Sequence, residues 1–416
     1  MNTRLLLAAF AMLAATNSFA TSVPPVSKEW RSYTEPLVPI GAQLDSLLQD
    51  SKDTQLRAEL YNNFFAIMAQ GVFGVAYADP EHPDFWPVQN GVFNNLGPNP
   101  DNVYYLAAIA DDGVYKISGT RGTVKTIKFG VGSGTAFTRG IGGIGPTLAD
   151  YNADSLHINP DGTFEVLLSK TRPEGYQGDW WPLGAKAGYI LVRQTSYDWV
   201  HEVDGRLAIE RLDRPAAKPR STPTYLDERM KELVGYAERN TRWSIEIVNR
   251  FRKKGFINKV LVHDFNSEGG LTTQKYIDGL FDLQPDEALI METDVPKCQY
   301  WNFQLTDELY AAIDYVNRQT TLNGYSARLD ADGKFRAVIS AQDPGVPNWL
   351  DNAGYQRGMI LGRWTECDAA PTPVITKVKI ADIRKYLPTD TPVISAEARD
   401  ASMRLRRKAA QMRRRW

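Results

Sequence analysis

The stretch Gly188-Tyr-Ile-Leu-Val-Arg-Gln-Thr-Ser-Tyr-Asp198 occurs twice in this chain in closely similar form. The second copy, Gly358-Met-Ile-Leu-Gly-Arg-Trp-Thr-Glu-Cys-Asp368, aligns without gaps and is identical at six of eleven positions. We interpret each copy as a nearly continuous apolar strand that ends in an arginine. An internal repeat of this kind predicts two copies of one structural unit.

Two further blocks repeat in the same order. Asp161–Ser169 matches Asp332–Ser340 at Asp, Gly, Phe and Ser, and a weaker ungapped match joins Val114–Val131 to Ala288–Leu305. Each copy also carries a Trp-bearing loop between its Asp-Gly turn and its apolar strand. Chance does not readily produce three blocks in one order at one spacing, so we expect both halves to fold alike.

The repeated blocks have the pattern of β structure. Apolar residues alternate at Phe164, Val166 and Leu168, which predicts a strand with one buried and one exposed face. Gly, Asp and Asn interrupt the strand-like segments, and no βαβ rhythm is visible, which argues against a parallel Rossmann-type sheet. The sequence therefore predicts a mainly β protein of two tandem antiparallel β-sandwich modules, jelly-roll-like, with accessory helices.

Helical and linker segments divide the expected modules. Leu56, Leu60, Phe64 and Met68 recur at four-residue spacing, which predicts an amphipathic helix, and Thr224–Lys254 has a similar pattern. The Pro-rich residues 21–40 predict an extended lead-in. The expected boundaries are a signal peptide at 1–20, an N-terminal extension and helix at 21–94, the first module at 95–213, a linker and helix at 214–258, the second module at 259–388 and a basic C-terminal helix at 389–416.

The beginning of the chain reads as a secretory signal. Arg4 supplies the positive charge, Leu5–Ala15 is a short apolar run, and Ser18-Phe-Ala20 offers the small residues of a cleavage site. We therefore expect a periplasmic or secreted protein. In an oxidising compartment Cys298 and Cys367 would form a disulfide by default, with two buried free thiols as the alternative.

Three segments carry a family resemblance: Gly97–Leu106, Asp314–Thr320 and Asp343–Asp351. Together they resemble the bacterial domain-of-unknown-function 1214 family, which is related to the 1254 family. The likeness extends from about residue 95 to Pro388. It implies a pair of jelly-roll-like β-sandwiches, and it brings no established reaction and no agreed catalytic residues. Tyr355 departs from the family pattern, because many relatives have a histidine there.

The Trp-bearing loop of the second module holds the first candidate site. Asp343, Asn348, Trp349 and Asp351 lie within nine residues, among two prolines that would stiffen the loop. Paired carboxylates can divide acid and base roles in glycoside hydrolysis, so Asp343 and Asp351 are the candidate catalytic residues. Trp349 would offer a flat face to a sugar ring and Asn348 a hydrogen bond. The alternative is a packed loop without chemistry.

Asn99, Asp101 and Tyr104 form the second candidate, a polar cleft that would bind substrate. The alternative is a simple turn that leads into the first strand. Because both copies keep them, we expect Arg193 and Arg363 to serve the fold, each paired with a carboxylate at a sheet edge.

We expect neither a metal nor a cofactor. The four histidines are scattered, without the spacing of zinc ligands, and the Gly-rich run near residue 130 does not precede a helix that could bind phosphate. A formal net charge of −1 argues against nucleic acid as a partner.

We therefore expect an exported protein that binds or hydrolyses a glycan, with a carbohydrate or another small polar ligand as its partner. The alternative is a non-enzymatic periplasmic ligand-binding or cell-envelope assembly protein. The basic C-terminal segment could contact an anionic membrane or polysaccharide, or could be a solvated helix end. Its basic residues are Arg404, Arg406, Arg407, Lys408, Arg413, Arg414 and Arg415.

Overall fold

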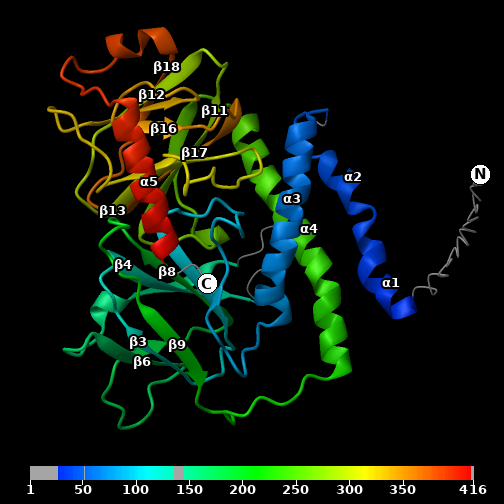
Figure 1. Ribbon diagram of the computed structural model, residues 1–416. Coiled ribbons are helices and arrows are strands. Elements are labelled where there is room, and N and C mark those ends of the chain that lie inside the picture. Colours follow the sequence, from blue (N-terminus) through cyan, green and yellow to red (C-terminus); the bar gives the residue numbers. More distant parts are fainter. Residues whose placement is uncertain (1–26, 51, 135–144, 414–416) are drawn as a thin grey trace, which may run out of the picture.

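The computed structural model describes residues 27–50, 52–134 and 145–413. The predicted signal peptide lies outside these residues. Figure 1 shows two β modules stacked one above the other, with long helices beside both of them. The two modules follow each other along the chain, as the sequence repeat predicts.

The first module consists of a five-stranded sheet of order β1-β2-β8-β4-β5 and a four-stranded sheet of order β7-β6-β3-β9. All pairings are antiparallel except β6 with β7. Its strands are β1 (Trp86–Pro87), β2 (Asn102–Ala108), β3 (Tyr115–Thr120), β4 (Thr126–Ser133), β5 (Thr147–Asn152), β6 (Thr163–Ser169), β7 (Trp180–Pro182), β8 (Ala187–Thr195) and β9 (Arg206–Arg211).

The second module repeats this arrangement strand for strand. Its sheets have the orders β10-β11-β17-β13-β14 and β16-β15-β12-β18, and its single parallel pair is β15 with β16. Its strands are β10 (Lys259–His263), β11 (Gln274–Asp282), β12 (Glu287–Thr293), β13 (Cys298–Thr306), β14 (Thr321–Asn323), β15 (Phe335–Ser340), β16 (Trp349–Asp351), β17 (Arg357–Cys367) and β18 (Val374–Lys379). The repeated stretches are therefore β8 and β17, each the central strand of its larger sheet.

Each module forms its core between its larger and its smaller sheet. In the first module Phe129 and Ile190 of the larger sheet pack with Phe164 of the smaller one. In the second module Phe303 stacks on Phe335 with 5.4 Å between the ring centroids. The two sheets thus bury their alternating apolar residues against each other, and the predicted tandem β-sandwich fold is confirmed.

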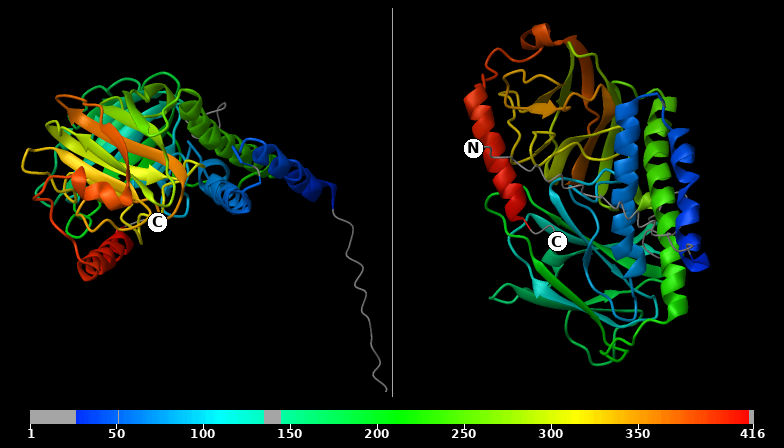
Figure 2. Two further views of the ribbon diagram at one scale, coloured as in Figure 1. Left: turned by 90° about the horizontal axis from the view of Figure 1, so that it is seen from above. Right: turned by 45° about the vertical axis from the view of Figure 1, so that its right-hand side comes forward.

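Helices cover the second face of both larger sheets. Leu191 of β8 packs into a cluster with α3 and α4, and Leu361 of β17 packs against Trp243 and Phe251 of α4. β8 and β17 are therefore buried on both faces, which explains why their sequences are almost continuously apolar. Figure 2 shows α3 and α4 on one side of the molecule and α5 on the other. The helices are α1 (Lys28–Thr34), α2 (Ile40–Asp45), α3 (Thr54–Gly71), α4 (Pro223–Lys253) and α5 (Ala396–Met412).

The N-terminal segment differs from the extended lead-in that its prolines suggested. Helix α1 begins at Lys28 because the side chain of Ser27 accepts a hydrogen bond from the Trp30 amide. The first module also begins earlier than expected, since the short strand β1 pairs with β2. Short helical turns connect other elements: Glu35–Leu37, Val72–Ala76, Ala153–Ser155, Asn266–Glu268 and Ile380–Lys385.

Cys298 and Cys367 face each other on the paired strands β13 and β17 and form a disulfide. This bond fastens one end of the central strand of the second module to its neighbour. No helix in the described part of the chain has both the length and the apolar character needed to span a membrane.

Candidate functional site

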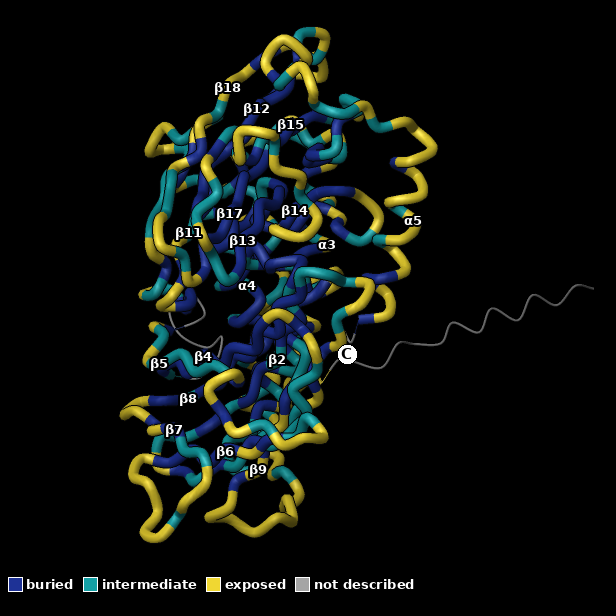
Figure 3. Tube along the Cα trace, turned by 90° about the vertical axis from the view of Figure 1, so that its left-hand side faces the viewer, coloured by how far each residue is buried: buried dark blue, intermediate teal, exposed yellow. Residues whose placement is uncertain are grey.

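The two central strands place one arginine each at the junction of the modules. Arg193 of β8 lies beside Tyr104 of β2, and Arg363 of β17 lies beside Tyr276 of β11. Both arginines are two residues beyond a leucine that packs against the helices, so they lie on the helix-facing side of their sheets. Figure 3 shows β8 and β17 as mostly buried segments, one in each module.

Each arginine reaches from its own module into the other. The Arg193 Nη2 donates to the Gly269 carbonyl at 2.8 Å, and the Arg363 Nη2 donates to the Gly97 carbonyl at 2.9 Å. Gly97 and Gly269 stand five residues before the equivalent strands β2 and β11. The contact is therefore reciprocal, and the internal duplication has produced a pseudo-twofold site.

The loops before β2 and β11 have matching geometry. Gly97 and Gly269 have φ values of 57° and 87°, a region that favours glycine. A β-carbon at Gly97 would also lie within 2.8 Å of the Tyr310 ring. The Tyr104 hydroxyl accepts a hydrogen bond from the amide five residues upstream at 2.9 Å, and the Tyr276 hydroxyl does the same at 3.1 Å.

These residues surround a cavity of about 80 Å³, which we call the intermodule cavity. A cavity needs roughly 10–15 Å³ on this measure to hold one water, so this one has room for several waters or for a small organic anion. It is lined by Gln89, Leu96, Gly97, Asn102, Tyr104, Leu191, Arg193, Trp243, Phe265, Glu268, Gly269, Gly270, Gln274, Tyr276, Tyr310 and Arg363.

The two buried cations of the intermodule cavity have no ion-pair partner among the described residues. Arg193 is 9% exposed and Arg363 is 6% exposed. Their hydrogen-bond partners are the two glycine carbonyls and, for Arg363, the side-chain oxygens of Asn302 and Gln304. Neither guanidinium forms an ion pair with a described carboxylate. Taking an unpaired charge out of water costs several kcal/mol even after relaxation.

Each of the two acids near the cavity has one carboxylate oxygen engaged and one without a hydrogen-bond partner in the described chain, the Glu268 Oε2 and the Asp150 Oδ1. Glu268 lines it but forms an ion pair with Arg250 at 3.0 Å, and Asp150 accepts hydrogen bonds from Thr272. Burial raises the pKa of Tyr276, while the charges of Arg193 and Arg363 act in the opposite direction. Both cations therefore act on the same hydroxyl inside the cavity.

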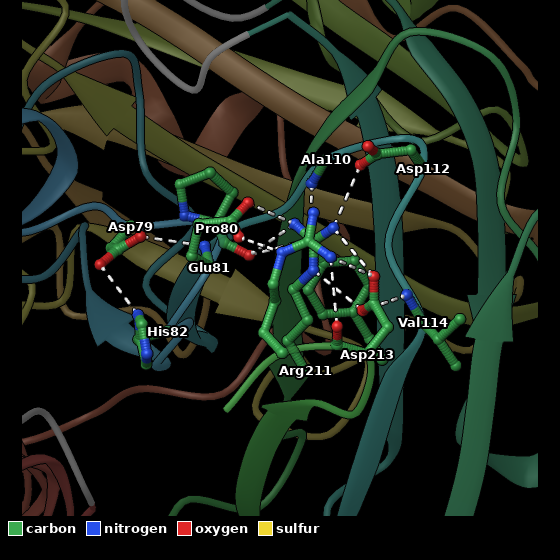
Figure 4. Close-up of polar contacts among 11 residues, drawn as sticks. Asp79, Pro80, Glu81, His82, Ala110, Asp112, Val114, Arg211 and Asp213 are labelled. Carbon is green, nitrogen blue, oxygen red and sulfur yellow. Dashed lines mark hydrogen bonds and ion pairs between the residues drawn. The ribbon is translucent and has the colours of Figure 1, made fainter. Parts of the chain in front are cut away.

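Arg211 shows how this protein neutralises a buried arginine (Figure 4). Its guanidinium forms ion pairs with Glu81 at 2.7 Å, Asp112 at 3.2 Å and Asp213 at 2.9 Å. The hydrogen bond from Arg211 lowers the pKa of Asp213 to about 2. Arg211 has three acid partners, and its ion pair with Glu81 connects the segment before β1 to the first module. The two cavity arginines, in contrast, have no acid partner in the described chain.

Two polar atoms of the cavity wall lack a protein partner. The Asn102 Oδ1 and the Glu268 Oε2 are buried and accept no hydrogen bond from the described residues. Buried acceptors are nearly always satisfied in native proteins, by water where no protein group is available. The cavity therefore combines two cations with two free acceptors.

The expected roles of Arg193 and Arg363 are wrong in two respects. They lie on central strands and not at a sheet edge, and they bind carbonyl and amide oxygens in place of a carboxylate. The physical reason is that both faces of β8 and β17 are covered, so a long side chain on the helix side can only reach the opposite module.

The four candidate residues of the second Trp-bearing loop are engaged in packing. Asp343 binds Arg399 of α5 at 2.9 Å, and Asp351 is buried with an ion pair to Arg318 at 2.8 Å. The Asn348 side chain donates to two backbone carbonyls and accepts from a backbone amide. The Trp349 indole donates to the Ser340 carbonyl at 3.0 Å. The two carboxylates have separate cationic partners, and neither lines the intermodule cavity.

Of the second candidate set, only Tyr104 lines the intermodule cavity. The Asn99 side chain bonds Tyr300 and Asn302 of the other module. Asp101 is buried and accepts hydrogen bonds from the Trp199 indole, Asn323 and the Tyr300 hydroxyl. Burial raises the pKa of Asp101. This segment joins the two modules through buried polar contacts, which a turn alone would not do.

The basic C-terminal helix is docked on the protein by part of its arginines. Arg399 lies over the Trp349 ring of the second module, 5.3 Å from its centre. Arg406 and Arg413, seven and fourteen residues later, lie over the Trp199 ring of the first module at 4.3 and 5.8 Å. Arg413 also forms an ion pair with Asp204 at 3.1 Å. The helix therefore bridges the modules, and these arginines are not available to a membrane.

Sequence reasoning missed Tyr276, Gln274 and the pairing of the two arginines across the junction. The signal was present, because an arginine inside an otherwise apolar strand must find polar partners in the interior. The partners of each arginine, however, lie in the other module, where no pattern local to its own strand indicates them.

A solved structure supports the fold. Among solved structures the chain is similar to an uncharacterised protein from Burkholderia cenocepacia, with a TM-score of 0.78 and 29% identity over 85% of this chain and 97% of that one. A protein from Vibrio parahaemolyticus matches with a TM-score of 0.44 and 12% identity over 77% of this chain and 99% of that one. No protein-family model and no curated protein matches the chain, so the resemblance to the 1214 family stays a prediction.

Proposed function

We propose that this protein is an exported ligand-binding protein that holds a small oxyanion, such as a carboxylate, in the intermodule cavity. The observation that supports this most is the pair of buried guanidiniums, Arg193 and Arg363, that line one cavity without an acid partner in the described chain. An anionic ligand between them would supply the missing charge.

The chemistry of the cavity wall favours an oxyanion over a halide or a neutral ligand. Guanidinium groups form strong, directional hydrogen bonds to carboxylate and phosphate oxygens. The hydroxyls of Tyr104 and Tyr276 can donate to the same oxygens. The apolar walls of Leu191 and Trp243 would exclude water and strengthen these contacts.

Titration calorimetry with acetate, malonate and inorganic phosphate tests the proposal. The wild-type protein should bind at least one of them, and Arg193→Met and Arg363→Met should each weaken binding at least tenfold. Arg220→Met is the matched control, because Arg220 is exposed in the linker and its loss changes the net charge equally. Equal binding by the wild type and both cavity variants would show that the anion binds elsewhere, and no binding by the wild type would refute the proposal.

The cellular location is part of this proposal. The disulfide between Cys298 and Cys367 is the kind of bond that persists in an oxidising compartment, which fits the predicted signal peptide. Glycan binding or hydrolysis at Asp343 and Asp351 stays a sequence-based prediction. We favour the intermodule cavity because those two carboxylates already have cationic partners.

A further inference from the structure

A second, larger hollow is lined by Leu309, whose neighbour Tyr310 lines the intermodule cavity. This cleft has a volume of about 530 Å³, within the range of small-molecule sites. It lies between α3 and the loop that follows β13, and we call it the α3 cleft. Its lining includes Glu59, Asn62 and Asn63 of α3, and Asp307, Asp314 and Asn317 of the loop, with Tyr315 and Tyr355 as its aromatic residues.

The α3 cleft contains acids and no bases. None of its lining residues is a lysine, arginine or histidine. The Arg406 guanidinium contacts the cleft wall from outside the lining, because it donates to the backbone carbonyl of Tyr315 at 2.7 Å and lies over the Trp199 ring. The charged side chains that line the α3 cleft are therefore all acidic, whereas two arginines line the intermodule cavity.

The two carboxyl groups deepest in the α3 cleft retain free acceptor capacity. Glu59 accepts at its Oε1 from Gln55 and from the Tyr355 hydroxyl, at 2.8 and 3.2 Å. Asp307 accepts at its Oδ1 from the amides of Leu309 and Ala311, both at 2.9 Å. In both residues these hydrogen bonds use only one of the two carboxylate oxygens.

Asn63 adds an independent sign of a ligand. It is 8% exposed, and its Nδ2 donates to the Asn94 carbonyl at 2.9 Å. Its Oδ1 is buried at the cleft wall and accepts no hydrogen bond from the described residues. A buried amide oxygen without a donor is costly, so the site calls for a ligand or water that donates.

We infer that the α3 cleft binds a small organic cation, an alkyl ammonium group whose N–H donors bind Glu59, Asp307 and the Asn63 Oδ1. An ammonium group has three donors and no acceptor, which matches three acceptors around one cavity. The alkyl part would lie against the rings of Tyr315 and Tyr355, where cations and apolar groups are both favoured. Burial raises the pKa of Asp307 to about 7, so a bound cation would also favour the ionised carboxylate.

Calorimetric titration with n-butylamine, n-butanol and Ca²⁺ tests this inference on the full chain. We expect butylamine to bind, and butanol and Ca²⁺ to bind at least tenfold more weakly. Glu59→Gln and Asp307→Asn should each weaken butylamine binding at least tenfold, while Glu29→Gln, on the exposed face of α1, should leave it within twofold. Because Asp307 is buried, circular dichroism would confirm that its variant is folded.

Asn63→Leu provides a second variant that removes the free acceptor without changing the charge. It should weaken butylamine binding at least threefold. The inference is wrong if the wild type does not bind butylamine, if butanol or Ca²⁺ binds as tightly, or if none of the three cleft variants weakens binding. The anion and cation probes and their variants are distinct, so this inference and the proposed oxyanion site can fail separately.

Discussion

Replacing Arg193 by methionine should have little effect on the stability of the ligand-free protein. The substitution removes one charge-assisted hydrogen bond to Gly269, which contributes about 1.5–3 kcal/mol. It also removes a buried charge without an acid partner, whose desolvation costs several kcal/mol. The two effects oppose each other, so we expect a net change in unfolding free energy of less than about 1 kcal/mol.

Replacing Arg211 by methionine is the matched comparison. This arginine is equally buried, but the change would leave Glu81, Asp112 and Asp213 without their common partner. Breaking a buried ion pair costs about 3–5 kcal/mol, and water reaches these partly exposed acids, so we expect a loss of about 2–4 kcal/mol.

Urea unfolding followed by circular dichroism measures both variants, with and without the best oxyanion from the titrations. At a ligand concentration one hundred times Kd, the wild type should gain about 2.7 kcal/mol and Arg193→Met almost nothing. The reasoning is refuted if Arg193→Met loses as much stability as Arg211→Met without ligand, or if it keeps the gain with ligand.

Three further predictions concern other parts of the molecule. Burial raises the pKa of Asp307 to about 7, so the protonated carboxyl group stabilises the folded state fully below about pH 4. This stabilisation is lost as the pH rises through 7. Asp307→Asn should therefore be more stable than the wild type at pH 8 by about 2–4 kcal/mol, measured by urea unfolding. Reducing the bond between Cys298 and Cys367, which are 69 residues apart, should lower the unfolding free energy by about 4 kcal/mol, and a melting temperature unaffected by reductant would contradict this. Arg399→Met should release α5, with a loss of about 2–4 kcal/mol and faster proteolytic cleavage of the helix, whereas unchanged cleavage would show that the ion pair with Asp343 does not hold it.

The sequence was sufficient to predict the duplicated β-sandwich fold. Equivalent blocks ending at Arg193 and Arg363 became equivalent central strands, because the same alternation and turns produce the same sheet in both halves. The helices α3 and α4 also followed from their periodicity. The periodicity of each helix could not show that the helices cover the second face of the larger sheet in both modules.

The site depends on contacts between residues that are far apart in the sequence. Arg193 meets Gly269 and Arg363 meets Gly97 only after the modules dock, and no spacing within one module indicates this. Residues kept in both copies need not serve only the fold, because Arg193 and Arg363 line one cavity. When a duplicated side chain lies at a pseudo-twofold junction, both copies of it can line the same cavity.

A crystal soaked in sodium selenate would test the central claim most directly, because selenium in an oxyanion can be located by its anomalous scattering. We predict an anomalous peak in the intermodule cavity within hydrogen-bond distance of the Arg193 and Arg363 guanidiniums, and its loss in Arg193→Met. Selenate bound only at the protein surface, with water alone between the two arginines, would contradict the account.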